Sequence, residues 1–215
     1  MIKLYTIKGG VELTSNIAPC LLLLEELRTP YQVIELNIDN MEHKSESFLK
    51  ISPNGLLPCL DDEGSIFWET ISINCYLAEK YHPEVFSTNL KDKALIRQWL
   101  FWSASEFQYN VSSYLMLYAM PQYQRNTEYL EIFKSRIIAN TKLINNQLNG
   151  KKFIIGNTIT LADIQILPFM NIHYLLKTDI TLYPNFRIWF KMLMKGLYLE
   201  RLYEKKLIKS PYTNS

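Results

Sequence analysis

The chain has 215 residues, of which 48% are hydrophobic and 20% charged, and its formal net charge is +2. A chain of this length can bury enough apolar surface to fold without disulfides. Its charges are interspersed without a basic run, which argues against nucleic acid or an anionic membrane as a partner. The first ten residues lack the apolar core of a signal peptide, and no apolar run reaches the length of a membrane span. We therefore expect a cytoplasmic protein.

The cysteines Cys20, Cys59 and Cys75 show neither a C-x-x-C spacing nor a zinc-ligand spacing. We therefore predict no metal site. An odd number of cysteines is typical of a reducing compartment. We interpret all three as small, buried apolar side chains.

Residues 1–82 alternate between strand-like and helix-like patterns. Met1 to Thr6 predicts a strand, and Cys20 to Leu27 predicts a helix with Pro19 in its first turn. The alternating run from Tyr31 to Ile38 predicts a second strand, and the polar segment from Glu42 to Lys50 has helical character.

The next segment begins with a turn at residues 52–55, which are Ser-Pro-Asn-Gly. Two short strands then flank a hairpin turn at Asp61 to Gly64, and the spacing of Ile73, Leu77 and Tyr81 predicts a helix over 70–81. The order β-α-β-α-β-β-α is the connectivity of a thioredoxin-like domain.

Helical patterns dominate the rest of the chain. Thr160 and Asp163 have the spacing of a capping box, with Ile159 and Ile164 at the positions of a hydrophobic staple, so we predict a helix that begins at Thr160. We expect the polar tail, residues 210–215, to be frayed. The other predicted helices run from Lys91 to Met120, Asn126 to Asn149, Pro184 to Lys195 and Leu197 to Lys206.

Several motifs together resemble the cytosolic glutathione transferase family, and they extend over nearly the whole chain. Residues 52–60 resemble the family pattern NPxGxVPxL, residues 68–70 its ES pair, and residues 76–81 its YLxxKY segment. In the second half, residues 156–163 resemble its G-x-x-x-T-x-A-D helix cap and residues 183–189 its final YPxxxxW segment.

The resemblance implies the glutathione transferase fold, an α+β thioredoxin-like N-terminal domain followed by an all-α C-terminal domain. Residues 1–82 would form the glutathione-binding domain, 83–90 a linker, and 91–215 the helical domain that binds the second substrate. Trp99, Trp102, Phe107, Tyr114 and Tyr118 could line an apolar pocket there, although we expect most of them to be core.

The resemblance also implies where glutathione binds. Pro58 would be a cis-proline that leaves the backbone of Leu57 free to pair with the cysteinyl part of glutathione. Glu69 and Thr70 lie where a helix begins, so the carboxylate could accept from the γ-glutamyl ammonium group while helix N–H groups and the Thr70 hydroxyl bind its carboxylate. His43, in the segment that resembles EHKS, would lie near the glycine end together with the next residue, Lys44.

The thiolate-stabilising group is expected in the loop before the first helix. Counting back from Leu24 to Leu27, which resembles the family's LEEL, places Thr14, Ser15 and Asn16 on its T-x-N or S-x-N segment, a type that theta/nu-like bacterial members carry. A hydroxyl there can hydrogen-bond a thiolate and lower its pKa. The loop is several residues longer than most in the family, so Ser15 could replace Thr14 in this role. Tyr5, near the end of the first strand, is a further possibility that fits the spacing poorly.

The implied function is transfer of the glutathione thiolate to a small, apolar, electrophilic substrate by a homodimeric enzyme. One alternative is disulfide-bond reduction with glutathione, in which Cys20 could take part. Another alternative is a non-catalytic regulator or scaffold that has kept the fold.

Overall fold

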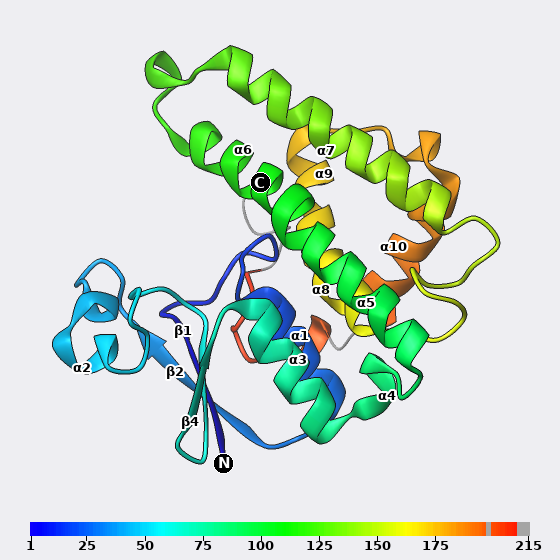
Figure 1. Cartoon of the computed structure of the whole chain (residues 1–215). Helices are drawn as coiled ribbons and strands as arrows, with labels where there is room; N and C mark the ends of the chain where they lie inside the picture. Colours follow the sequence, from blue (N-terminus) through cyan, green and yellow to red (C-terminus); the bar gives the residue numbers. More distant parts are fainter. Residues whose placement is uncertain (197–198, 210–215) are drawn as a thin grey trace. The chain divides into compact units, whose positions relative to one another are not determined.

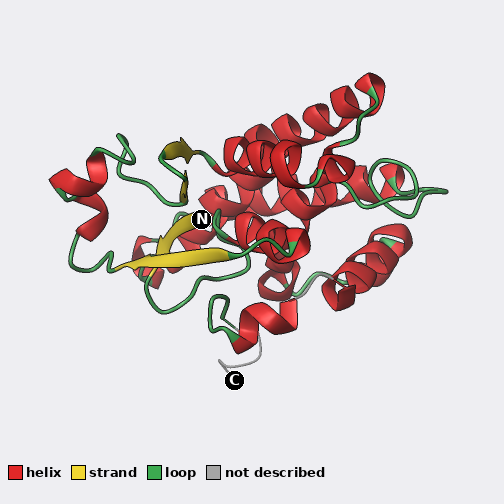
Figure 2. Ribbon diagram, turned by 90° about the horizontal axis from the view of Figure 1, so that it is seen from below, coloured by secondary structure: helices red, strands yellow, loops and turns green. Residues whose placement is uncertain are grey.

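The computed structural model describes residues 1–196 and 199–209, and its contacts divide the chain into two compact units (Figure 1). The first unit combines residues 1–86 with those that are described from Lys195 onwards, and the second unit runs from Ser87 to Met194. The predicted frayed tail, residues 210–215, lies outside the described residues. All strands of the described chain belong to the first unit, while the second unit consists of helices and loops (Figure 2).

The first unit is built on a four-stranded sheet with the order β2-β1-β3-β4. Strand β1 (Ile2–Ile7) pairs in parallel with β2 (Tyr31–Leu36) and antiparallel with β3 (Cys59–Asp62), which forms a hairpin with β4 (Ser65–Trp68). The buried residues of β1 alternate with half-buried ones, as expected for a strand covered differently on its two faces.

Helices α1 (Ala18–Leu27) and α3 (Thr70–Tyr81) pack against each other, and the apolar run of α1 is almost completely buried. Helix α2 (Glu46–Leu49) follows the short 3₁₀ turn Glu42–Lys44. It carries Phe48, whose ring lies 5.7 Å from that of Tyr5 in β1. Tyr5 therefore serves as a packing residue of the sheet.

The second unit contains α5 to α9 and most of α10. The predicted helix over 91–120 is present but is interrupted by a π-helical stretch, Ser103–Gln108, between α5 and α6. The unit's core contains Trp99, Phe107 and Tyr114, as expected, whereas Tyr118 is exposed. The helices are α5 (Leu90–Trp102), α6 (Tyr109–Ala119), α7 (Thr127–Gln147), α8 (Leu161–Ile166), α9 (Ile172–Leu176) and α10 (Pro184–Gly196).

The order β-α-β-α-β-β-α and the all-helical second half are both confirmed. The observed division differs from the predicted domain boundaries in two places. Residues 83–86, predicted as part of a linker, form the short helix α4 (Pro83–Phe86). Helix α11 (Leu199–Glu204) and the residues up to Lys209 group with the first unit, although the pattern assigned them to the helical domain.

Candidate functional site

The predicted site residues converge only in part, on a pocket of the first unit beside the start of α3. Of the nine predicted residues, Asn16, Leu57, Pro58, Glu69 and Thr70 line this pocket, whereas Thr14, Ser15, His43 and Lys44 do not. The same unit has larger hollows of about 320 and 440 Å³, but neither contains any of these residues. We therefore choose the pocket beside α3 as the candidate site because of the residues that line it, although other hollows of the unit are larger.

The turn at residues 52–55 sets one wall of this pocket. The Ser52 Oγ lies 2.8 Å from Asn54 Oδ1 and 3.0 Å from the Leu56 carbonyl oxygen, and it accepts from the Leu56 N–H at 3.2 Å. Gly55 has φ +60°, and a Cβ there would lie 2.8 Å from the His43 carbonyl oxygen. Only glycine allows this close approach, so the turn depends on Gly55.

The peptide bond between Leu57 and Pro58 is cis, as the resemblance implied. Within the described residues, neither the N–H nor the C=O of Leu57 has a hydrogen-bond partner. An extended ligand could therefore pair with Leu57 as an added strand does with a sheet edge.

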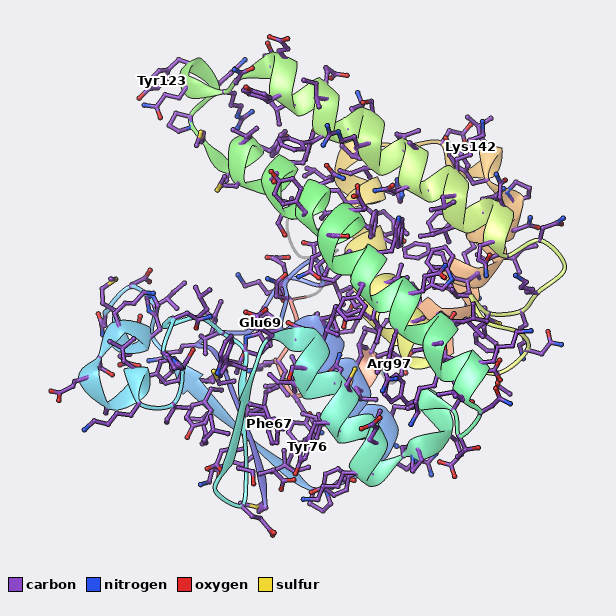
Figure 3. The ribbon with its side chains drawn as sticks, in the orientation of Figure 1. Phe67, Glu69, Tyr76, Arg97, Tyr123 and Lys142 are labelled. Carbon is purple, nitrogen blue, oxygen red and sulfur yellow. The ribbon has the colours of Figure 1, made fainter. Side chains whose placement is uncertain are left out.

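Glu69 and Thr70 form the opposite wall, where α3 begins (Figure 3). Glu69 has φ 71° and ψ 120°, a conformation that costs a residue with a side chain about 1–3 kcal/mol and that is concentrated at functional sites. Its side chain is exposed. The first N–H groups of α3 have no acceptor within the helix, and together with the helix dipole they favour an anion at this end.

The hydroxyl of Thr70 does not have the role that the sequence suggested. Thr70 is buried, and its Oγ1 donates to the Asn16 carbonyl oxygen at 2.7 Å. Its single hydrogen is thereby used to tie α3 to the loop before α1. In this arrangement the donors that α3 offers to a ligand are backbone N–H groups.

In the loop before α1, the side chains of Thr14 and Ser15 differ in their hydrogen bonds. Ser15 lies in the turns that lead into α1: its Oγ accepts from the Ala18 N–H at 3.3 Å, and its N–H donates to the Glu12 carbonyl oxygen at 2.9 Å. Thr14 is half-buried, and its hydroxyl has no hydrogen-bond partner among the described residues. Both hydroxyls thus keep their hydrogen for a ligand, but the Ser15 oxygen is tied to the Ala18 N–H, whereas the Thr14 hydroxyl has no other hydrogen bond among the described residues.

Lys44 reaches the pocket indirectly. Its Nζ donates to the carbonyl oxygen of Asn54, a lining residue, at 3.0 Å. The Nδ1 of the neighbouring His43 is buried and lacks a partner in the described part of the chain. The Lys44 side chain therefore supports the turn at 52–55 and places a positive charge beside it.

Three lining residues, Asn54, Leu56 and Trp68, were not among those predicted. Phe67 stacks on Tyr76 of α3 with ring centroids 3.9 Å apart (Figure 3). Since successive strand residues point to opposite faces, Trp68 points away from Tyr76. Trp68 is 45% exposed. A large aromatic residue directly before the Glu-Thr pair was the signal that could have identified it.

The motif at residues 76–81 anchors α3 and does not reach the pocket. Asp62 of β3 is buried and accepts from Tyr76 Oη at 2.7 Å, Lys80 Nζ at 2.6 Å and Tyr81 Oη at 2.8 Å. Burial alone would raise the pKa of Asp62, but these hydrogen bonds outweigh it and lower the pKa. The ionised carboxylate therefore holds α3, and with it Glu69, against the sheet.

The cysteines offer no reactive thiol at this pocket. Cys20 is fully buried, its Sγ lies 4.0 Å from the Thr70 carbonyl oxygen, and burial raises its pKa far above the usual range. Cys59 is also buried, and burial raises its pKa as well. Both thiols remain protonated at neutral pH, which argues against the nucleophilic role considered for Cys20.

Among the described residues, no group of three or more His, Cys, Asp or Glu side chains could hold a metal ion. No helix in this part of the chain is both long and apolar enough to cross a membrane.

Comparison with known proteins adds the following. Residues 10–79 match the glutathione S-transferase N-terminal domain, and residues 107–195 match the glutathione S-transferase C-terminal domain. Glutathione S-transferase F13 of Arabidopsis thaliana is 27% identical, covering 88% of this chain and 89% of that protein. Glutathione S-transferase D6 of Drosophila melanogaster is 29% identical, covering 77% and 76%. The structure of glutathione transferase URE2P6 from Phanerochaete chrysosporium in complex with oxidized glutathione has a TM-score of 0.84 at 24% identity, covering 95% and 96%.

Proposed function

Because the chain belongs to the glutathione S-transferase family, we propose that it joins the sulfur of glutathione to an electrophilic carbon of a small apolar substrate. The observation that carries this proposal is the pocket in which a cis Leu57-Pro58 bond faces the start of α3. These two features offer a strand-like edge and a helix N-terminus, which together suit an extended, zwitterionic peptide.

The proposed binding mode follows from the lining groups. The free N–H and C=O of Leu57 pair with the backbone of the cysteinyl residue. The γ-glutamyl carboxylate accepts from the first N–H groups of α3, while its ammonium group donates to Glu69. Lys44, fixed to the Asn54 carbonyl, supplies a positive charge for the glycine carboxylate. This mode places the thiol toward the loop that carries Thr14.

The chemical step needs an ionised sulfur. In the proposed mechanism the thiol proton passes to solvent, and the Thr14 hydroxyl donates to the resulting thiolate. The sulfur electron pair then forms the C–S bond, while the leaving group departs with the electron pair of the bond that breaks. The second unit, with its apolar helices, supplies the site for the electrophile. A T-x-N activation segment of the theta/nu-like type and a cytoplasmic location are parts of the same proposal.

Glutathione binding is tested by replacing Glu69 with glutamine, which removes the charge and keeps the shape. We expect the variant to bind glutathione about 1.5–3 kcal/mol more weakly, the range for a hydrogen bond to a charged group. Calorimetric titration measures this difference, and the fluorescence of Trp68 at the pocket wall gives a second readout.

Glu63→Gln is the matched control, because Glu63 is likewise an exposed glutamate with positive φ but belongs to the β3–β4 turn. Equal affinities for wild type and Glu69→Gln would remove Glu69 from the γ-glutamyl site.

Failure of the wild type to be retained on immobilised glutathione would contradict the proposed function and favour a regulator or scaffold. Parallel conjugation and disulfide-reduction assays distinguish the two possible reactions.

We also propose a homodimer, as the resemblance to the family implies. The second unit exposes large apolar side chains, including Phe101 and Tyr123, that could contribute to such an interface. Light scattering at micromolar concentration should give twice the chain mass of 25.3 kDa. A mass equal to that of one chain would contradict the dimer.

A further inference from the structure

The loop between β1 and α1 is paired with a segment from the other end of the chain. The Val11 N–H donates to the Leu207 carbonyl oxygen at 3.0 Å, and the Lys209 N–H donates to the Val11 carbonyl oxygen at 2.9 Å. These bonds form a parallel bridge between Val11 and Ile208. We call residues 205–209 the C-terminal strap; its red trace lies beside the blue loop in Figure 1.

The contact between strap and loop is close. Val11 and Ile208 are each only 3% exposed, so the bridge is buried in the first unit. Gly10 has φ +80°, and a Cβ at this position would lie 2.7 Å from the Lys206 carbonyl oxygen. Gly10 therefore supplies both the left-handed backbone and the space that the strap requires.

Contacts with the rest of the first unit fix the first residues of the strap in place. Lys205 Nζ forms an ion pair with Glu25, which is buried in α1 and also accepts from the Tyr31 hydroxyl. The Leu207 N–H donates to the Leu202 carbonyl oxygen in α11 at 2.9 Å. The strap is thus a fixed edge against which the loop can be positioned.

We infer that the C-terminal strap positions the segment Thr14 to Asn16, and thereby sets how strongly the chain stabilises the glutathione thiolate. Val11 precedes Glu12, whose carbonyl oxygen accepts from the Ser15 N–H at 2.9 Å and whose carboxylate lies 3.5 Å from Lys209 Nζ. The bridge at Val11 therefore fixes the turn that presents Thr14. This inference rests on the proposed function and assigns the strap a positioning role, because it acts through the loop at Val11.

The physical reason is pre-organisation. A long loop with two adjacent glycines has many accessible conformations, and restricting each residue to one of them costs about 1–2 kcal/mol in backbone entropy. A donor that must stabilise a developing or bound anion is effective only when it is held in place before the charge forms. The strap performs this restriction from a segment that is distant in sequence.

The test compares two replacements of Lys209. Lys209→Pro removes the N–H that donates to Val11, whereas Lys209→Ala keeps that N–H and removes only the exposed ion pair with Glu12. For Lys209→Pro we expect the midpoint of the absorbance titration of bound thiolate to rise by about one pH unit and kcat at neutral pH to fall roughly tenfold, with KM for glutathione nearly unchanged. Lys209→Ala should resemble wild type in all three measurements.

The rate of amide hydrogen exchange over residues 11–16, measured without glutathione, reports how firmly the strap holds the loop. This rate should be higher in Lys209→Pro than in Lys209→Ala and wild type. If Lys209→Pro fails to fold by circular dichroism, Ile208→Ala, which weakens the same bridge through its buried side chain, takes its place. Unchanged exchange and an unchanged thiolate titration in a folded variant would overturn the inference. Faster exchange in a chain whose wild type shows no bound thiolate would instead contradict the proposed function.

Discussion

Replacing Thr14 with alanine is expected to raise the pKa of glutathione bound to this chain and to lower kcat at neutral pH by roughly tenfold to a thousandfold. The Thr14 hydroxyl has no partner among the described residues, so it can donate to the sulfur without breaking another bond. A donor to the thiolate favours the charged form and lowers its pKa, and its loss therefore raises the pKa.

The predicted signature is a change in kcat with little change in glutathione affinity, because the lost interaction is made to the reacting charge. At pH values well above both midpoints, wild type and variant hold the same fraction of thiolate, so the difference in turnover should narrow. Absorbance of the bound thiolate, titrated against pH, measures the shift directly. Thr14→Ser keeps the hydroxyl and should be close to wild type.

Ser15→Ala is the matched control for this experiment. The Ser15 oxygen accepts from the Ala18 N–H, so its loss should slightly weaken the turn that leads into α1. If Thr14 is the donor to the sulfur, the thiolate titration of Ser15→Ala should be unchanged. If only Ser15→Ala moves the titration, the assignment is displaced by one residue. If neither variant moves it, the activating group lies outside this loop.

Asp163→Ala is expected to destabilise the second unit by roughly 4 kcal/mol or more, since each buried donor left without an acceptor costs about 1–3 kcal/mol. The carboxylate is fully buried and accepts from the Ile154 N–H at 2.9 Å, the Thr160 N–H at 2.9 Å and Trp189 Nε1 at 2.8 Å. It also completes the predicted capping box with Thr160. One side chain therefore joins α8 to the preceding loop and to α10.

A loss of this size is a large part of the 5–15 kcal/mol that typically separates folded from unfolded chains, so low soluble yield and a markedly lower Tm should follow. Urea denaturation measures the effect. Asp179 is the matched control: it accepts from the N–H and hydroxyl of Thr181, but it is exposed. Asp179→Ala should lower the stability much less than Asp163→Ala does, because solvent can replace its hydrogen bonds. Equal costs for the two variants would show that burial of the Asp163 network is not the cause.

Local patterns predicted the elements well where their signals lie within one or two turns. The helix expected over 70–81 has those bounds in the structure, and the capping box at Thr160 and Asp163 forms as expected. The cis bond at Pro58 was predicted from the resemblance to a family and not from local chemistry.

Features that depend on distant partners could not be predicted in this way. Three such features lie around one pocket: the positive φ of Glu69, the bond from the Thr70 hydroxyl to the Asn16 carbonyl, and the exposed Trp68. The π-helical stretch Ser103–Gln108 likewise lacks a marker in its own sequence. Each depends on packing against residues that periodicity does not identify.

The amino-acid sequence by itself determined the order of the elements, the caps at Thr160 and the motifs that indicate a glutathione site. These features depend on contacts between residues a few positions apart, whose geometry the backbone dictates. Only the tertiary structure decided that residues 205–209 belong with the first unit and that Val11 pairs with Ile208. That pairing joins segments almost two hundred residues apart, and it forms because the folded sheet and α11 bring both within hydrogen-bonding distance.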